Sequence, residues 1–353
     1  MRKKLLITLI CISGFLRFTG VCAQEQRVNR SWADRLEYAG IAVEEPGYHV
    51  WGASPVIGPN GKTHLFVSRW PVEEGFGAWI THCEIARYVS DRPEGPFVFK
   101  EVVIRGTETD TWDRKSPHNP NVHRVNNQYV LLYIANSGGS RNEKVASQRI
   151  GMMIANSPEG PWKKAGDHGL ILEPPTDSLI WSHGSVVGVN NPALFAHPDG
   201  RYFLYYKAMK KGDVRRMGVA IADKLEGPYV FHKEYLTGND TEIEDGYAFF
   251  EDGKVCFLTT NNHQGEGYLW KSEDGLHFDI PVLGFDRIEH YVGSESVKNA
   301  TILRGKKFER PQILMMDGKP RYLYVASGIN ITGGNTSCSC VLRIKNPGQF
   351  STK

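Results

Sequence analysis

The chain has 353 residues, with 42 lysine or arginine and 39 aspartate or glutamate side chains, for a formal net charge of +3. Four of the positive charges and no acidic residue fall within residues 1–23, which leaves 38 basic against 39 acidic side chains. This balance, without a basic stripe, excludes nucleic-acid binding driven by overall charge. It gives no indication of the oligomeric state.

The N-terminus is typical of a secretion signal. A basic start at residues 2–4 precedes an apolar stretch at residues 5–16, and residues 21–23 offer a small-residue cleavage site. The stretch is too short for a stable membrane span, and no later segment is apolar enough for one. We therefore predict a signal peptide at residues 1–23 and a secreted or periplasmic protein. Lipid attachment at Cys22 is the less favoured alternative, because the residue before it is a poor match.

One pattern recurs five times along the rest of the chain. Each copy opens with a short apolar run at a proline or glycine, and the openings are Ser54-Pro55, Asn119-Pro120, Asn191-Pro192, Asp245-Gly246 and Arg310-Pro311. An aromatic-rich strand follows each opening. A third strand then runs into a glycine-containing turn, and three such turns read Glu-Gly-Pro-aromatic, starting at Glu94, Glu159 and Glu226. The openings are 65, 72, 54 and 65 residues apart, which leaves room for three or four strands in each copy.

A period of about 50 to 70 residues with three or four strands per copy indicates radial repetition. One small sheet cannot bury both of its faces alone, whereas sheets stacked around an axis bury them against their neighbours. We therefore predict an all-β fold, a five-bladed β-propeller, formed by residues 24–353 as a single domain. The alternative is a β-sandwich, which does not explain a turn repeated at constant phase.

The cysteines and histidines do not predict a metal centre. Four cysteines follow the predicted signal peptide, at 83, 256, 338 and 340, and none has the spacing of a zinc site. We interpret them as buried thiols. We predict no cofactor and no metal ligands, although a calcium ion on the propeller axis stays possible.

In a propeller the innermost strands line a central channel, whose mouth is the natural ligand site. Side chains near the strand openings should face this shared space, and they combine aromatic rings with planar polar groups that suit a sugar. The candidates for substrate binding are His49, Ser54, Arg69, Trp70, Trp112, Asp113, His118, Asn119, Asn191 and Arg310. The ligand predicted from this set is an oligosaccharide.

Three carboxylates are candidates for catalysis, because glycoside hydrolysis usually needs two carboxyl groups across the scissile bond. Glu244 and Glu309 each precede the proline or glycine by two residues, so the pleat should aim them alike. Asp245 should face away from Glu244 unless the strand has not yet begun. The alternatives are a structural ion pair for Glu309 and a turn-capping role for Asp245.

The repeated openings, the Glu-Gly-Pro turns and two further motifs together resemble the five-bladed propeller glycoside hydrolases, which include families 43, 32, 117 and 130. The two motifs are Glu244-Asp245-Gly246 and Glu309-Arg310-Pro311-Gln312, and the second is similar to the fifth-blade motif of family 117. The resemblance implies a family 43 arrangement, with an aspartate base before the first-blade proline and a pKa-tuning aspartate in blade three. Ser54 and Asn191 stand at these positions, while Glu244 matches the fourth-blade acid.

The expected function is therefore a secreted glycoside hydrolase, exo-acting on a plant or algal oligosaccharide. Glu244 is expected to be the general acid, with its pKa raised by neighbouring carboxylates. Glu309 or Asp245 would be the base, with Asp113 and His118 in reserve. The alternatives are a carbohydrate-binding propeller that has lost catalysis and a glycoside phosphorylase, which would need basic side chains at the mouth.

Overall fold

The computed structural model describes residues 31–166 and 168–346. The predicted signal peptide (residues 1–23) and the alternative lipid site at Cys22 lie outside these described residues. Within them, no helix combines the length and the apolar character that crossing a bilayer requires. The described residues cover most of the propeller predicted for residues 24–353.

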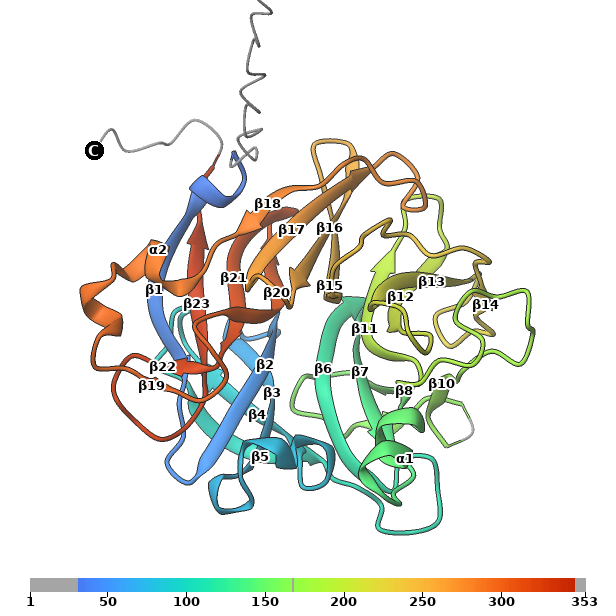
Figure 1. Cartoon of the computed structure of the whole chain (residues 1–353), viewed down its shortest axis with the longest axis horizontal. Helices are drawn as coiled ribbons and strands as arrows, with labels where there is room; N and C mark the ends of the chain where they lie inside the picture. The colour runs from blue at the N-terminus through green and yellow to red at the C-terminus, as the bar shows by residue number, and fades with distance from the viewer. Residues whose placement is uncertain (1–30, 167, 347–353) are drawn as a thin grey trace, which may run out of the picture.

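Five antiparallel sheets stand around a central axis (Figure 1), which confirms the predicted five-bladed β-propeller. Blade one contains β2 (Tyr48–Ile57), β3 (Thr63–Pro71), β4 (Glu84–Ser90) and β5 (Val98–Ile104). Blade two contains β6 (Lys115–Val125), β7 (Gln128–Asn136), β8 (Arg149–Ala155), β9 (Lys163–Lys164) and β10 (Leu170–Leu172). Blade three contains β11 (Asn190–Ala196), β12 (Tyr202–Ala208), β13 (Arg216–Ala222) and β14 (Val230–Phe231). Blade four contains β15 (Ile243–Glu251), β16 (Lys254–Asn261), β17 (Glu266–Ser272) and β18 (Val282–Phe285).

The fifth blade closes the ring with strands from both ends of the described chain. It contains β20 (Phe308–Met316), β21 (Lys319–Ser327), β23 (Cys338–Ile344) and, at its outer edge, β1 (Leu36–Val43). The β1 strand pairs antiparallel with β23, with Leu36 opposite Ile344. This pairing closes the ring, because it joins the start of the described chain to the last blade, as Figure 1 shows for the blue and red strands.

Among the described residues, five of the six apolar clusters each lie between two neighbouring blades. Every blade therefore buries both faces, and its middle strands are buried almost throughout instead of alternating between buried and exposed positions. In β7, for example, all residues from Tyr129 to Asn136 are buried. The three Glu-Gly-Pro turns repeat in conformation as well as in sequence, because their glycines share φ values of 98°, 88° and 92° and each is followed by a cis proline.

The inner strands β2, β6, β11, β15 and β20 surround the axis, and each has a β-bulge near its start. The first bulge residue has a positive φ in every blade, and these residues are Gly52, Asn119, Asn191, Asp245 and Arg310. The residues just before the bulges are Trp51, His118, Asn190, Glu244 and Glu309. A bulge of this kind re-aims the side chains beside it, so both sets can face the axis.

This register corrects the expected position of the blade-one residue. Gly52, and not Ser54, is the structural equivalent of Asn119 and Asn191. Ser54 stands two residues further along its strand, at the level of Gln312. The proline after Ser54 suggested the wrong phase, because blade one places its bulge at a glycine two residues earlier.

Short helices and one small sheet complete the described fold. The helices are η1 (Ala33–Arg35), η2 (Val72–Glu74), η3 (Phe76–Ile80), α1 (Arg141–Ala146), α2 (Ile288–Val292) and η4 (Glu295–Val297). The small sheet pairs β19 (Thr301–Ile302) with β22 (Ile329–Asn330). Of these elements, η3 and α1 contribute side chains to the pocket described next.

Candidate active site

A pocket of about 220 Å³ lies at the axis and is lined by residues from all five blades. Its lining consists of Trp51, Ser68, Trp70, Phe76, Trp79, His118, Asn119, Val145, Gln148, Val187, Asn190, Asn191, Lys207, Arg215, Glu244, Asp245, Arg304 and Glu309. All five residues that precede the bulges are among them. The radial geometry thus brings side chains that are far apart in sequence to one small volume.

Seven of the residues predicted from the sequence lie in this lining. They are the candidate catalytic residues Glu244, Asp245 and Glu309 and the candidate binding residues Trp70, His118, Asn119 and Asn191. Asp245 shares the pocket with Glu244, contrary to the simple pleat, because its φ of 61° belongs to the bulge.

Glu244 is held as an anion by its surroundings. Lys207 Nζ donates to its Oε2 at 2.6 Å, and Arg215 Nη1 and Asn262 Nδ2 donate to its Oε1. Burial alone would raise the pKa of Glu244, but the charges of Lys207 and Arg215 outweigh it and lower the pKa to about 2. The expected raised pKa was therefore wrong, because the sequence did not show that two cations converge on this carboxylate.

Asp245 is the carboxyl group that is poised to hold a proton. Burial and the neighbouring charge of Glu244 raise the pKa of Asp245 to about 6, although Arg310 acts in the opposite direction. Asn191 Nδ2 donates to its Oδ1, and Arg310 Nη1 lies 3.6 Å from the same oxygen. Glu244 and Asp245 are adjacent in sequence and differ by about four in pKa, the pattern by which two carboxyl groups take different roles.

Glu309 stands beside them on β20 and is almost fully buried. Arg304 Nε donates to its Oε1 at 3.1 Å, and Lys307 Nζ lies 3.0 Å from the same oxygen. The expected alternative of an ion pair with a neighbouring arginine is thus present. The same residue nevertheless lines the pocket, and its hydrogen bond from Arg304 uses Oε1.

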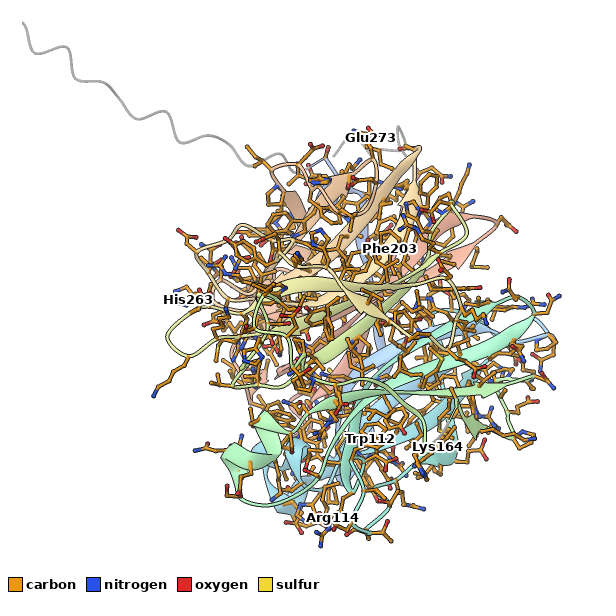
Figure 2. All side chains as sticks on the ribbon, turned by 90° about the vertical axis from the view of Figure 1, so that its right-hand side faces the viewer. Trp112, Arg114, Lys164, Phe203, His263 and Glu273 are labelled. Atoms are coloured by element: carbon orange, nitrogen blue, oxygen red, sulfur yellow. The ribbon has the colours of Figure 1, made fainter. Side chains whose placement is uncertain are left out.

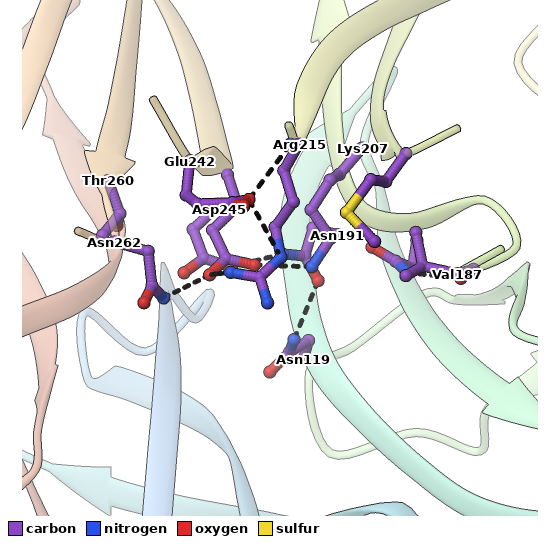
Figure 3. A network of polar contacts seen from close by, with 12 residues as sticks. Asn119, Val187, Asn191, Lys207, Arg215, Glu242, Asp245, Thr260 and Asn262 are labelled. Atoms are coloured by element: carbon purple, nitrogen blue, oxygen red, sulfur yellow. Dashed lines mark hydrogen bonds and ion pairs between the residues drawn. The ribbon is translucent and has the colours of Figure 1, made fainter. Parts of the chain in front are cut away.

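A chain of side-chain amides joins three blades below the carboxylates (Figure 3). Asn119 Nδ2 donates to Asn191 Oδ1 at 3.0 Å, and Asn191 in turn donates to Asp245. On the other side, Lys307 Nζ donates to Asn262 Oδ1 at 2.7 Å, and Asn262 donates to Glu244. The carboxylates are therefore fixed from both sides.

Arg310 occupies the space that a blade-one side chain would need. It is fully buried, and its Nη2 donates to the carbonyl oxygen of Asn119 at 2.9 Å. A Cβ atom built on Gly52 would lie 2.9 Å from Arg310 Cγ, closer than real Cβ contacts. The Arg310 side chain therefore leaves no room for a carboxylate side chain at position 52 of blade one.

We expect Gly52→Ala to destabilise the protein by about 2 to 4 kcal/mol, since it combines a left-handed φ with overpacking against Arg310. Gly212→Ala is the matched control, because Gly212 has a φ of 80° but open space around it. Its cost should be about 1 to 2 kcal/mol from the backbone alone. Chemical denaturation of both variants measures the difference, and equal losses would contradict the crowding.

Aromatic rings form the opposite wall of the pocket. Trp51 and Trp70 each contact Phe76 edge-on, with ring centroids 5.5 and 5.7 Å apart, and Trp79 contacts His118 in the same way at 5.2 Å. Apolar faces of this kind stack on the C–H surfaces of a sugar ring. The pocket therefore has a charged side and an aromatic side.

Two predicted binding residues lie close behind the lining. His49 is buried against Trp70, with ring centroids 5.5 Å apart, and accepts a hydrogen bond from Ser337 N. Ser54 Oγ donates to Gln312 Oε1 at 3.0 Å deeper on the axis. Like Arg310, both support the pocket without lining it.

Three other predicted binding residues lie outside this pocket. Arg69 is paired with Glu45 and Glu84 at 2.7 and 2.9 Å, on the side of its strand that faces away from the lining. Trp112 packs on Tyr133, and Asp113 forms an ion pair with Lys164 at 2.5 Å. Figure 2 shows Trp112 and Lys164 together in blade two. Trp112 and Asp113 precede the bulge of blade two by several residues, so the strand opening did not predict their positions.

The two reserve bases are engaged with the protein. Asp113 accepts hydrogen bonds from Thr111 and Tyr133 besides its ion pair. Both ring nitrogens of His118 are within hydrogen-bonding distance of protein oxygens, Ser116 O at 2.7 Å and Gln148 Oε1 at 3.2 Å. Burial lowers the pKa of His118 to about 4, so its ring is neutral near pH 7.

Sequence reasoning missed the cations of the charged side. Lys207, Arg215 and Arg304 are not among the site residues predicted from the sequence, although all three line the pocket. Lys207 lies one residue before the end of β12, directly opposite Asn190 of β11, a position that could have been found from the repeat. Arg304 lies in a loop, where no repeat position marks it.

Among the described residues there is no group of three or more histidine, cysteine, aspartate or glutamate side chains that could hold a metal. The fully buried guanidinium of Arg310 stands beside Asp245 and would repel a second cation there.

The fold and pocket define a class of protein, the five-bladed propeller with a carboxylate-lined axial pocket. A scan against protein-family profiles finds no match. A family 117 glycoside hydrolase from Zobellia galactanivorans has the same fold, with a TM-score of 0.62 at 18% identity over 87% of this chain and 89% of that one. A family 43 enzyme from Xanthomonas citri, solved with xylotriose, has a TM-score of 0.57 at 13% identity over 92% and 96% of the two chains. The predicted resemblance is thus confirmed at the level of fold.

One curated relative extends the comparison to sequence. An extracellular endo-α-(1→5)-L-arabinanase of Bacillus subtilis (strain 168) is 24% identical over 242 residues, or 62% of this chain and 46% of that protein. The chain therefore matches about half the length of this relative.

Proposed function

We propose that this protein is a glycoside hydrolase that acts on arabinan- or xylan-like chains. The observation that carries the proposal is that Glu244 and Asp245 line one pocket in different surroundings. Lys207 and Arg215 lower the pKa of Glu244, whereas burial and the charge of Glu244 raise the pKa of Asp245. An arabinanase relative and a neighbour solved with xylotriose support the substrate class. The aromatic wall supplies the stacking surface that such sugars need.

In this proposal Asp245 is the general acid and Glu309 is the general base. Asp245 keeps its proton to about pH 6, close to the pH at which a general acid is most effective. Glu309 binds its cations through Oε1, so Oε2 is the atom that would take a proton from water. Glu244 remains ionised, and its charge helps to keep Asp245 protonated.

The proposal extends to an exo-acting, secreted enzyme. A pocket of about 220 Å³ that ends on the buried amides of the axis has room for a terminal sugar unit. Secretion is supported by the basic and apolar pattern of residues 1–23. Expression of the full chain, followed by mass spectrometry of the exported protein, tests whether these residues are removed.

Two other functions compete with hydrolysis. A carbohydrate-binding propeller without catalysis is favoured by Gly52 and Asn191, which carry no carboxylate where family 43 is expected to have one. A phosphorylase is favoured by Lys207, Arg215 and Arg304 in the lining. Incubation with defined arabino- and xylo-oligosaccharides, with and without phosphate, separates the three. Release of single sugars without phosphate supports hydrolysis, and binding without any release contradicts it.

Activity should not depend on a divalent metal. We expect dialysis against a chelator to leave kcat/KM unchanged within about twofold, because Arg310 already supplies a buried positive charge at the axis. Elemental analysis of the purified protein is the control for removal of the ion. A loss of more than tenfold that calcium restores would contradict this expectation.

A further inference from the structure

The charged side of the pocket presents its cations outward and keeps its anions behind them. The carboxylate side chains of Glu244, Asp245 and Glu309 are 8%, 6% and 4% exposed. The guanidinium side chains of Arg215 and Arg304 are 31% and 37% exposed. A ligand that enters from solvent therefore meets two arginines before it reaches the carboxylates.

The positive charges around the pocket also outnumber the carboxyl groups that they face. Five cations stand in this network, namely Lys207, Arg215, Arg304, Lys307 and Arg310. Four carboxyl groups face them, namely Glu242, Glu244, Asp245 and Glu309. The excess of positive charge grows to two when Asp245 holds its proton. An active site for an uncharged sugar has no need of this excess.

The backbone holds Arg304 in place, and its terminal guanidinium nitrogens are available to bind a ligand. Its backbone N–H donates to the carbonyl oxygen of Gly328 at 3.0 Å, and a Cβ atom on Gly328 would lie 2.7 Å from Arg304 Cβ. Its Nε donates to Glu309. Among the described residues, neither of its two terminal nitrogens donates a hydrogen bond. Terminal guanidinium nitrogens form a fork that matches the two oxygens of a carboxylate or sulfate.

We propose that the pocket recognises a sugar that carries an oxyanion, either the carboxylate of a uronic acid or a sulfate ester, through Arg304 and Arg215. This inference rests on the proposed function and narrows it, since the bound unit of such a chain would be one that carries an acidic substituent. The aromatic wall stacks on the ring, and the two arginines bind the oxyanion on the opposite side. A sugar that bears both features is held in one orientation over the carboxylates.

Ligand-observed NMR titration with matched sugars tests the proposal. Galactose, galacturonate and galactose 6-sulfate share one ring and differ only at C6, and glucose, glucuronate and glucose 6-sulfate form a second series. We expect one charged sugar to bind at least about tenfold tighter than its neutral parent, the gain of one charge-assisted hydrogen-bonded pair. The charged member that binds best distinguishes a uronate from a sulfate ester.

Arg304→Gln should lower the affinity for the charged sugar by at least about fivefold more than the affinity for its neutral parent, so the ratio of the two affinities should fall towards one. Arg105→Gln is the matched control, because Arg105 Nε also donates to a glutamate, Glu84, at 3.0 Å but lies outside the pocket. Raising the salt concentration should weaken the preference in the unaltered protein, a readout that needs no folded variant.

The outcomes separate this inference from the proposed function. Equal binding of neutral and charged sugars would overturn the oxyanion site and leave the hydrolase proposal intact. Failure of every sugar in both series to bind would overturn the oxyanion site, and failure of the arabino- and xylo-oligosaccharides to be bound or cleaved would remove the hydrolase proposal. Tight binding of inorganic phosphate together with phosphate-dependent turnover would also overturn the inference, since the cations would then serve a phosphorylase.

Discussion

Replacement of Asp245 by asparagine is expected to lower kcat/KM by about 10² to 10⁴-fold on a glycoside with a poor leaving group. The substitution keeps the shape of the side chain and the hydrogen bond from Asn191, but it removes the proton that the leaving oxygen needs. On a dinitrophenyl glycoside, whose leaving group needs no protonation, the loss should shrink to less than about tenfold.

This contrast between leaving groups distinguishes a general acid from a structural residue. A variant that only distorts the pocket loses activity on both substrates alike. The control is Asp274→Asn, because Asp274 caps the turn to His277 far from the pocket lining. Equal losses on the two substrates for Asp245→Asn would contradict the assignment of the acid.

Glu309→Gln is expected to abolish turnover on both kinds of substrate, with a loss of about 10² to 10⁴-fold in kcat. A glutamine cannot take a proton from water, and a better leaving group does not replace the missing base. Added azide or formate should restore part of the activity, because a small anion can enter the vacated position. Sugar binding should persist, as measured by the same NMR titrations.

Glu309 also pairs with Arg304 and Lys307, so a purely structural role predicts a different result. If the role is only structural, the melting temperature of the variant falls together with its activity, and no added anion restores turnover. Rescue by azide with an unchanged melting temperature supports the base, and its absence with a lowered melting temperature contradicts it.

The architecture could be predicted because the same sequence pattern recurs in each blade. The phase-locked Gly-Pro turns and the spacing of the openings are properties of each blade, and each blade packs in the same way on its neighbours. The closure by β1 was not predicted, since Leu36–Val43 belongs to no repeat and completes a blade whose other strands begin more than 260 residues later.

The site was only partly predictable. Residues next to a bulge, such as Glu244 and Glu309, follow the repeat and were placed in one pocket. The lowered pKa of Glu244 could not be predicted in this way, because it depends on Lys207 and Arg215, which approach from blade three. The blade-one position was assigned to Ser54 instead of Gly52, since a proline two residues beyond the bulge imitates the pattern of the other blades.

The pH dependence of kcat/KM in the unaltered protein and in Glu244→Gln tests the central claim most directly. Deprotonation of Asp245 should cause activity to fall as the pH rises through about 6. Removing the charge of Glu244 takes away one cause of the raised pKa of Asp245, so the alkaline limb should move to lower pH in the variant. An alkaline limb that stays in place, or moves to higher pH, would contradict the assignment of Asp245 as the acid held in its protonated form by Glu244.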